Sequence, residues 1–309
     1  MRFIDFFAGI GGFRLGMEMA GHKCVGHCEI DKFAQASYNA MHNPKGSEWF
    51  ANDITTVNPD ELPEADCYCG GFPCQSFSVA GKRGGFEDTR GTLFFEVMRL
   101  ARIRKPKYLF LENVKGLLSH DGGRTFGTIL NTMGECGYDA EWQVLNSKDF
   151  GVPQNRERVS IIGHLRGRSR PKVFPITETN NATLKQLVGG SQGYRVYDPS
   201  GVSCTLASEA GGMGAKTGLY FVSQPRYGKY QGSKTSQTIR VGGDIPLVLE
   251  SSFVRRLTPR ECFRLQGFPD EYFERAKAVN SNSQLYKQAG NSVTVNVIHA
   301  IAEKLGEVK

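Results

Sequence analysis

Short apolar runs, glycine-rich turns and stretches of helical periodicity alternate through the first 163 residues. Residues 1–9 have the pattern of a strand that ends in the turn Gly9-Ile10-Gly11-Gly12, and residues 13–20 follow with apolar positions at helical spacing. A second strand is predicted at residues 23–27. Strand, glycine-rich turn and helix in this order predict the opening of a nucleotide-binding βαβ unit.

The same pattern continues further along the chain. The other elements predicted before Gly163 are strands at residues 65–69, 108–111 and 141–146, and helices at residues 92–104 and 124–135. Residues 79–91 are rich in glycine and charge, and we interpret them as a mobile lid.

The pattern changes after Gly163. Residues 164–255 are rich in Gly, Ser, Thr and basic residues, with short β-like pieces such as residues 219–222, which predicts a small, loop-rich β lobe. Regular pattern returns where Thr258 is placed to cap a helix with Pro259 at its first position. A last helix is predicted from near Ser292 to the end of the chain.

Composition sets the broad class. The 309 residues suffice for one large domain with an appendage, or for two domains, and 39% are hydrophobic and 22% charged. No apolar run approaches the ~20 residues of a membrane span, and the apolar stretch at the N-terminus is too short for a signal peptide. The spacing of the eight cysteines matches neither a redox pair nor a zinc site, so we expect reduced thiols and a cytoplasmic protein.

Positive charge is concentrated in one third of the chain. Between His164 and Arg260 there are 14 Lys/Arg and 5 Asp/Glu, whereas the remainder has 24 basic and 26 acidic residues. The segment is either a solvated basic face or a lobe that binds a polyanion, and an excess of this size favours the second interpretation.

Reactive residue types follow the predicted strands. Cys74 comes directly after Gly70-Gly71-Phe72-Pro73, on the tight loop that leaves a buried strand, where a side chain is well placed to meet a ligand. It is either a nucleophile or a small buried hydrophobe. Glu29 and Asp53 lie at predicted strand ends. Glu29 can accept hydrogen bonds from ribose hydroxyls or be a plain surface carboxylate, and Asp53 can lie near an adenine amino group.

Two further segments carry charge next to buried strands. Glu112 ends an interior strand, where a carboxylate is costly unless it is paired or protonated, so it is a functional or a satisfied structural group. Gln154, Arg156 and Arg158 alternate onto one face of a short extended run. Two guanidinium groups on one face suit an anionic or carbonyl-rich ligand, and solvent-facing salt bridges are the alternative.

Taken in order, these segments resemble the motifs of the C5 cytosine-specific DNA methyltransferase family, over essentially the whole chain. The segments are Asp5 to Gly12 (DFFAGIGG), Glu29, Asp53-Ile54, Gly71 to Ser78 (GFPCQSFS), Glu112 to Val114 (ENV), Gln154 to Val159 (QNRERV), Arg256 to Pro269 (RLTPRECFRLQGFP) and Gly290 to Val293 (GNSV). Asn52 and Phe6 depart mildly from the usual pattern. The compact size resembles the short restriction–modification enzymes of the family.

The resemblance implies a fold and an activity. The fold is an α/β, Rossmann-like S-adenosylmethionine-dependent methyltransferase domain, with a mixed, mostly parallel sheet and helices on both faces, plus a small β target-recognition domain. The activity is methyl transfer from S-adenosyl-L-methionine to C5 of a flipped cytosine in duplex DNA. Cys74 would add to cytosine C6, Glu112 would hold the N3/N4 edge, Arg158 would bind O2, and Gln154 and Arg156 would support the pocket. No metal is required.

The resemblance also assigns binding residues. The cofactor residues it implies are Phe7, Ala8, Gly9, Gly11, Gly12, Glu29, Ile30, Asp53, Ile54, Asn291, Ser292 and Val293, with Ile30 and Ile54 on either side of the adenine ring. In the basic lobe, Gln192 would fill the gap left by the flipped cytosine, Arg195 would read a guanine, and Thr205 would lie near a phosphate. An ordinary polar loop is the alternative for Gln192 and Arg195.

The domain boundaries that follow are 1–163 for the catalytic domain, 164–270 for the target-recognition domain and hinge, and 271–309 for a segment that returns to the catalytic domain. We expect a bacterial or phage-encoded monomer that binds double-stranded DNA and no membrane. A cognate restriction endonuclease would be encoded nearby and not bound. Two alternatives stay open: a tRNA cytosine-5 methyltransferase, and a catalytically inactive DNA-binding paralogue.

Overall fold

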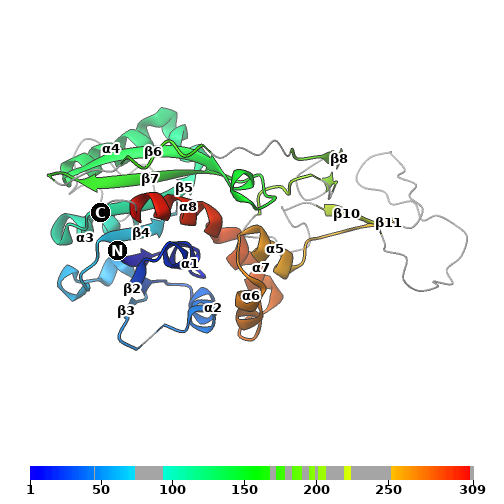
Figure 1. Cartoon of the computed structure of the whole chain (residues 1–309), viewed down its shortest axis with the longest axis horizontal. Coiled ribbons are helices and arrows are strands. Elements are labelled where there is room, and N and C mark those ends of the chain that lie inside the picture. Colours follow the sequence, from blue (N-terminus) through cyan, green and yellow to red (C-terminus); the bar gives the residue numbers. More distant parts are fainter. Residues whose placement is uncertain are drawn as a thin grey trace, which may run out of the picture.

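The structure is a computed structural model that describes residues 1–44, 46–73, 93–167, 172–177, 183–189, 195–198, 201–206, 219–223 and 252–306. Cys74, Gln192 and the predicted lid at residues 79–91 lie outside the described residues. Residues from the first half of the chain and residues 259–306 build the larger body, which holds the large sheet and its helices (Figure 1).

A seven-stranded sheet with the order β3-β2-β1-β4-β5-β7-β6 forms the centre of this body (Figure 1). Strands β3, β2, β1, β4 and β5 run parallel, and β7 pairs antiparallel with both β5 and β6. The strands are β1 (Arg2–Phe6), β2 (Lys23–Cys28), β3 (Trp49–Ala51), β4 (Cys67–Gly71), β5 (Tyr108–Val114), β6 (Tyr138–Asn146) and β7 (Glu157–Leu165). Because parallel strands end at the same edge, the segments after β1, β2, β4 and β5 meet there.

Helices cover both faces of the sheet, because alternate residues of each buried strand point to opposite sides. One hydrophobic cluster joins Ile4 and Leu109 of the sheet to α3 (Leu93–Arg104) and α4 (Arg124–Glu135). The other joins Phe3 and Phe110 to α1 (Gly12–Met19) and α8 (Val295–Gly306). The predicted Rossmann-like fold, mostly parallel with helices on both faces, is confirmed.

Four more helices pack together beside the glycine-rich turn: α2 (Lys32–His42), α5 (Pro259–Leu265), α6 (Asp270–Lys277) and α7 (Asn282–Asn291). Their buried side chains share a cluster with Ile10 of the turn. The predicted start of α5 is confirmed, since Thr258 and Glu261 form a reciprocal capping box with Pro259 at the first position. The predicted last helix is confirmed as α8, which begins at Val295, and α7, which ends at Asn291 just before it, was not predicted.

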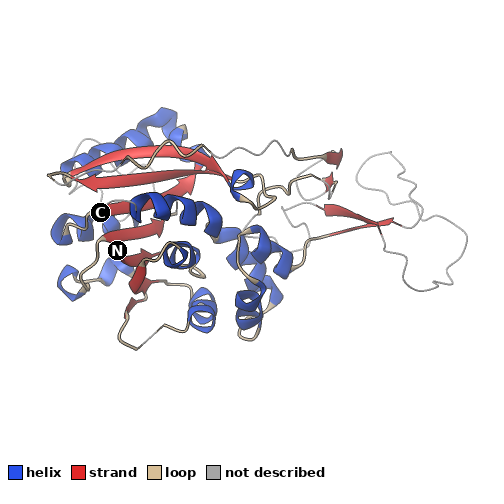
Figure 2. Cartoon of the chain, in the orientation of Figure 1, coloured by secondary structure: helices blue, strands red, loops and turns tan. Residues whose placement is uncertain are grey.

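Several short elements complete the described chain. The 3₁₀ turns are η1 (Ile54–Thr56), η2 (Pro59–Glu61), η5 (Lys115–Leu118), η6 (His120–Gly123) and η7 (Ser147–Phe150). A second sheet has the order β11-β10-β9-β8, with β8 (Gln186–Val188), β9 (Val196–Tyr197), β10 (Leu219–Ser223) and β11 (Ser252–Arg255). It lies beyond α5, away from the large sheet (Figures 1 and 2). The predicted domain boundaries at residues 163 and 270 stay predictions. No helix within the described ranges is long and apolar enough to cross a membrane.

Candidate active site

The turn between β1 and α1 has an unusual backbone. Phe7, Gly9 and Gly11 have φ angles of 56°, 56° and 80°, in the left-handed region. A bulky aromatic residue rarely adopts such a φ, and backbone strain of this kind gathers at functional sites. Two backbone hydrogen bonds hold the turn: the Gly11 amide donates to the Ala8 carbonyl at 2.7 Å, and the Ala8 amide donates to the Cys28 carbonyl at 3.0 Å.

The segment between α7 and α8 closes over this turn. A Cβ atom on Gly12 would lie 2.8 Å from both Ser292 Oγ and Val293 Cγ2, so a side chain at this position would collide with the segment. Ser292 and Val293 are buried, whereas Asn291 is exposed. The structure therefore brings together two parts of the predicted cofactor site that are about 280 residues apart in sequence.

Glu29 stands at the end of β2 and reaches the turn. Its Oε2 accepts a hydrogen bond from the Gly9 amide and its Oε1 accepts one from the Asp31 amide, both at 2.7 Å. Burial raises the pKa of Glu29, and the two amides oppose that rise because they stabilise the carboxylate. Next to it, the Ile30 side chain is 72% exposed, which is unusual for an isoleucine and leaves an apolar surface beside the turn.

The Asp53-Ile54 pair follows β3 on the same edge. The half-buried Asp53 caps η1, where its Oδ1 accepts hydrogen bonds from the amide and hydroxyl of Thr55. Ile54 is only 3% exposed and belongs to the core cluster under α3. Of the two isoleucines predicted to enclose an adenine ring, Ile30 thus offers free surface, and Ile54 is largely covered by its own core.

Glu112 and Arg158 form an ion pair at the ends of β5 and β7. The antiparallel register places Val114 opposite Arg158, two residues from Glu112, and Arg158 Nε lies 3.3 Å from Glu112 Oε1. Burial raises the pKa of Glu112, with the charges of Arg158 and Arg156 opposing the rise. Burial also lowers the pKa of Arg158, with Glu112 opposing. A buried carboxyl beside one guanidinium is suited to hold a proton or to accept one.

The same carboxyl borders the strand that leads to Cys74. Glu112 pairs with Gly71 in the parallel register, and a Cβ on Gly71 would lie 3.4 Å from Glu112 Oε2. Asn113, which we did not single out from the sequence, donates from Nδ2 to the Phe72 carbonyl at 2.7 Å. The chain therefore leaves β4 with its direction fixed, two residues before Cys74.

Gln154 and Arg156 are both buried, and they bond to backbone groups. Gln154 donates from Nε2 to the Leu265 carbonyl at 2.7 Å, and its Oε1 accepts from the Leu206 amide at 3.2 Å. Arg156 donates to the carbonyls of Leu206, Gly290 and Ser292, at 3.2, 3.1 and 2.8 Å. Burial lowers the pKa of Arg156 to about 9. These two side chains join the strands of the catalytic body to the segment around Ser292 and to the start of the small lobe.

Two of the predicted DNA-contacting residues are described. The half-buried Thr205 donates from Oγ1 to the Asn155 carbonyl at 2.6 Å, which ties residues 201–206 to the run before β7. Arg195 precedes β9, and its side chain interacts with Tyr197, where it opposes the rise that burial causes in the pKa of the Tyr197 hydroxyl. Their roles toward DNA stay predictions.

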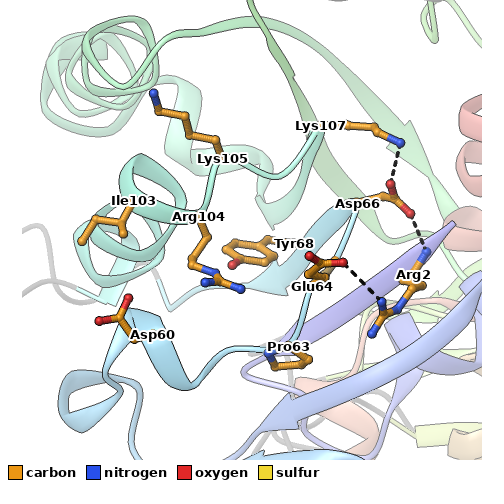
Figure 3. Close-up of a pocket in the computed structure, with 11 residues that line it drawn as sticks. Arg2, Asp60, Pro63, Glu64, Asp66, Tyr68, Ile103, Arg104, Lys105 and Lys107 are labelled. Carbon is orange, nitrogen blue, oxygen red and sulfur yellow. Dashed lines mark hydrogen bonds and ion pairs between the residues drawn. The ribbon is translucent and has the colours of Figure 1, made fainter.

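A cavity of about 620 Å³ opens at the opposite edge of the sheet, where β1 and β4 begin (Figure 3). Charged groups line one wall: Lys107 pairs with Asp66 at 2.6 Å, the Arg2 amide donates to Asp66, and Arg2 lies 3.9 Å from Glu64. These charges satisfy one another, and the cavity is remote from the strand ends that carry Glu29 and Glu112. The candidate active site is therefore at the carboxyl edge, built on strand ends.

Comparison with known proteins identifies the family of the chain. Residues 1–307 match the family described as C-5 cytosine-specific DNA methylase. Type II methyltransferase M.HhaI of Haemophilus parahaemolyticus is 39% identical, over 99% of this chain and 94% of the relative. Type II methyltransferase M.HpaII of Haemophilus parainfluenzae is also 39% identical, over 99% of this chain and 90% of the relative.

Solved structures share the fold at lower identity. The Entamoeba histolytica methyltransferase EhMeth superposes with a TM-score of 0.72 at 19% identity, covering 100% of this chain and 99% of that chain. The S. pombe Dnmt2 methyltransferase superposes with a TM-score of 0.70 at 18% identity, with the same coverage. The fold is thus that of the Rossmann-like methyltransferases. Within that class, the chain belongs to the C-5 cytosine-specific DNA methylase family.

Proposed function

We propose that this protein is a DNA (cytosine-5-)-methyltransferase, which transfers a methyl group from S-adenosyl-L-methionine to C5 of a cytosine flipped out of a specific duplex sequence. Family membership supports the reaction, and the relatives named as type II methyltransferases support a role in restriction–modification. The observation that carries the proposal is the buried Glu112–Arg158 pair beside the end of β4, three residues before Cys74.

The pair suits the activation of a cytosine ring. In our proposal the Cys74 thiolate adds to C6, the C5=C6 electron pair forms C4=C5, and the N3=C4 pair moves to N3, which takes the proton of the Glu112 carboxyl. A raised pKa of Glu112 favours that protonated starting form. Arg158 would hold O2 and favour the thiolate of Cys74. The C4=C5 pair would then form the C5–CH3 bond with the donated methyl group, and N3 would return its proton to Glu112 as N3=C4 re-forms. Loss of the C5 proton to water and cleavage of the S–C6 bond would restore the C5=C6 bond and the Cys74 thiolate.

The carboxyl edge also fits the cofactor. The left-handed turn at Gly9 and Gly11 leaves the backbone open to a ligand, Glu29 is held as a carboxylate by two amides, and Ile30 offers an apolar surface. S-adenosyl-L-methionine, when bound, would supply an electrophilic methyl group. Phe7 to Gly12 would hold its methionine part, Glu29 its ribose, Ile30 and Asp53 its adenine, and Asn291 to Val293 would close the pocket.

The nucleophile is tested with duplex DNA that contains 5-fluorocytosine. Fluorine replaces the C5 hydrogen that must be lost as a proton, so the reaction stops at the covalent adduct. We expect wild type to form an adduct that survives denaturing electrophoresis. Cys74→Ser should form none, and Cys136→Ala, which removes a thiol at the end of α4, should behave as wild type. An adduct with Cys74→Ser would contradict the assignment of Cys74.

The substrate is tested by labelled methyl transfer and by bisulfite sequencing of plasmid DNA from expressing cells. Transfer to duplex DNA at one repeated sequence would support the proposal and reveal that sequence. Transfer to tRNA and not to duplex DNA would establish the RNA enzyme instead. DNA binding without transfer to either substrate would establish an inactive paralogue.

Target recognition is a second part of the proposal. We infer that residues 164–270 recognise the duplex, with Gln192, Arg195 and Thr205 among the contacts, because the positive excess of the chain lies there. Arg195→Ala should reduce the sequence specificity seen in the bisulfite map. We expect methylation also at sites that differ from the target sequence by one base. An unchanged map would remove Arg195 from the reading residues.

A further inference from the structure

His42, at the last position of α2, touches the glycine-rich turn. Its Nε2 lies 3.0 Å from the Ile10 carbonyl oxygen. A carbonyl accepts but never donates, so Nε2 carries the hydrogen. Nδ1 is buried with no hydrogen-bond partner among the described residues. Burial lowers the pKa of His42 to about 3, so the ring is neutral near pH 7 and has this one tautomer.

The imidazole ring of His42 packs directly against the backbone of Gly11 and fills the space that a side chain there would need. A Cβ atom on Gly11 would lie 2.2 Å from His42 Nε2, so only glycine fits under the ring, in the left-handed conformation that Gly11 adopts. Tyr38 and Tyr272 hold the ring in place, with centroids at 4.8 and 5.4 Å. These ring contacts therefore orient the His42 side chain independently of its hydrogen bond to the turn.

The turn is thus held at two successive residues. Glu29 accepts from the Gly9 amide at 2.7 Å, and His42 donates to the Ile10 carbonyl. Glu29 lies three residues before α2, and His42 ends that helix. One rigid helix therefore fixes the distance between the two contacts, on the loop whose backbone would face the cofactor.

We propose that His42 is a positioning residue for S-adenosyl-L-methionine, which holds the glycine-rich turn in its ligand-binding shape through the hydrogen bond from Nε2 to the Ile10 carbonyl. This inference rests on the proposed function, since it is the methionine part of the cofactor that the turn would bind. His42 itself contacts the turn and not the reacting atoms, so its loss should affect binding more than the chemical step.

The test compares variants that keep and remove the donor. Gln places an amide nitrogen at the same number of bonds from Cα as Nε2, so His42→Gln keeps the donor, whereas His42→Met has similar length without one. If His42→Met does not fold, His42→Asn replaces it, since its amide is one bond too short. Arg275→Met is the control: it removes a 2.9 Å hydrogen bond to the carbonyl of Met41, the neighbour of His42, and leaves the turn alone.

Two measurements are made on each purified full chain. The first is calorimetric binding of S-adenosylhomocysteine, which should weaken about tenfold in His42→Met and by less than about twofold in His42→Gln and Arg275→Met. The second is amide hydrogen exchange of residues 8–12 without any ligand, which should quicken in His42→Met alone. In turnover, KM for S-adenosyl-L-methionine should rise in His42→Met while kcat changes by less than about twofold.

The outcomes separate the two proposals. A wild-type chain that binds no S-adenosylhomocysteine overturns the proposed function, and the exchange measurement still tests how His42 holds the turn. Normal binding and normal exchange in His42→Met, with binding by wild type intact, overturn the role of His42 alone. Equal weakening in Arg275→Met, or tenfold weakening in His42→Gln, also overturns it, because either result means that packing and not the donor matters.

Discussion

Two glutamates stand at strand ends on the same edge of the sheet, yet their surroundings differ. Glu29, after β2, accepts two short hydrogen bonds from backbone amides, which stabilise its charged form. Glu112, on β5, is enclosed by apolar strands and faces the guanidinium of Arg158 at 3.3 Å. Burial raises the pKa of both, and only in Glu29 do backbone amides counter it.

These surroundings suit one residue type to two tasks. A carboxylate held by amides is a fixed acceptor, which suits the hydroxyls of a ribose. A desolvated carboxyl, whose pKa is raised by burial, is suited to exchange a proton with a ring nitrogen. In this protein the part of the site that would bind the cofactor and the part that would bind the cytosine would thus differ in how their glutamates are solvated.

The largest effect is expected at Glu112. Glu112→Gln keeps the shape and removes the proton that N3 would take, so kcat should fall about 10³-fold, a few kcal/mol of transition-state stabilisation. Affinity for S-adenosylhomocysteine should stay within about twofold. Single-turnover methyl transfer and calorimetry measure the two quantities. A variant with nearly normal single-turnover rate would show that Glu112 has no proton to give.

Acid should first destabilise the part of the site around the glycine-rich turn, where β2 and α2 pack and the cofactor would bind. Burial lowers the pKa of His27 to about 4 and that of His42 to about 3, from 6.5 in the unfolded chain, and Arg14 adds to both shifts. The unfolded state therefore binds more protons below pH 6.5, so stability falls as pH decreases from 6.5 through about 4. For His27 the loss approaches about 3 kcal/mol at pH 4.

Thermal melting between pH 7.5 and 4.5 measures this loss. His27→Phe, which keeps the ring stack on Tyr38, should flatten the pH dependence. Hydrogen exchange at pH 5 should locate the opening at α2 and β2, not at β5 and β7. Exchange that increases first at β5 would mean that acid destabilises the part of the site that would bind the cytosine before the part that would bind the cofactor.

A smaller effect is expected at Glu29. Glu29→Gln turns one acceptor oxygen into an amide nitrogen that faces a backbone N–H, so affinity for S-adenosylhomocysteine should fall about 30-fold, near 2 kcal/mol. The kcat value at saturating cofactor should change little. Equal losses in kcat for Glu29→Gln and Glu112→Gln would remove the contrast between the two sites.

The smallest effect is expected at Asn113. Asn113→Ala removes the 2.7 Å hydrogen bond to the Phe72 carbonyl, near the start of the segment with Cys74. We expect kcat to fall about tenfold, since the direction of the chain after β4 is loosened. Affinity for the cofactor should not change. Asn113→Asp, an acceptor without the donor, should resemble the alanine variant, and normal kcat in both would show that the contact is only structural.

Much of the fold was predictable because local patterns carry it. The run before Gly9 predicts a strand, the spacing from Phe13 a helix, and Thr258 with Pro259 a helix start, and the structure has all three. Helix α7 escaped prediction, because its Asn, Ser and Gly residues have low helix propensity and its stability comes from distant partners. Ser37 of α2, for example, donates to Gln288 at 2.8 Å.

The site, like the fold, was predictable only where the local sequence carries the signal. Glycine-rich turns and carboxylates at the ends of apolar runs are visible in the local sequence, so Glu29 and Glu112 could be singled out. The backbone partners of Arg156 belong to segments 50 to 136 residues away. Nothing in the local sequence predicts that its guanidinium will donate hydrogen bonds to three backbone carbonyls. His42 has no sequence signal either, because its contact with Ile10 depends on how α2 lies beside the turn.

The packing of α8 on α1 sets an order of events during synthesis. Residues 12–19 leave the ribosome early, but Phe13 and Met17 are covered by Ile298 and Ile301, made almost 300 residues later. A contact so distant along the chain forms slowly, and the apolar face of α1 waits uncovered until then. A nascent or prematurely terminated chain would thus lack a closed cofactor pocket and would expose a surface that proteases and chaperones recognise. The cell would receive no partial methylating activity from incomplete molecules.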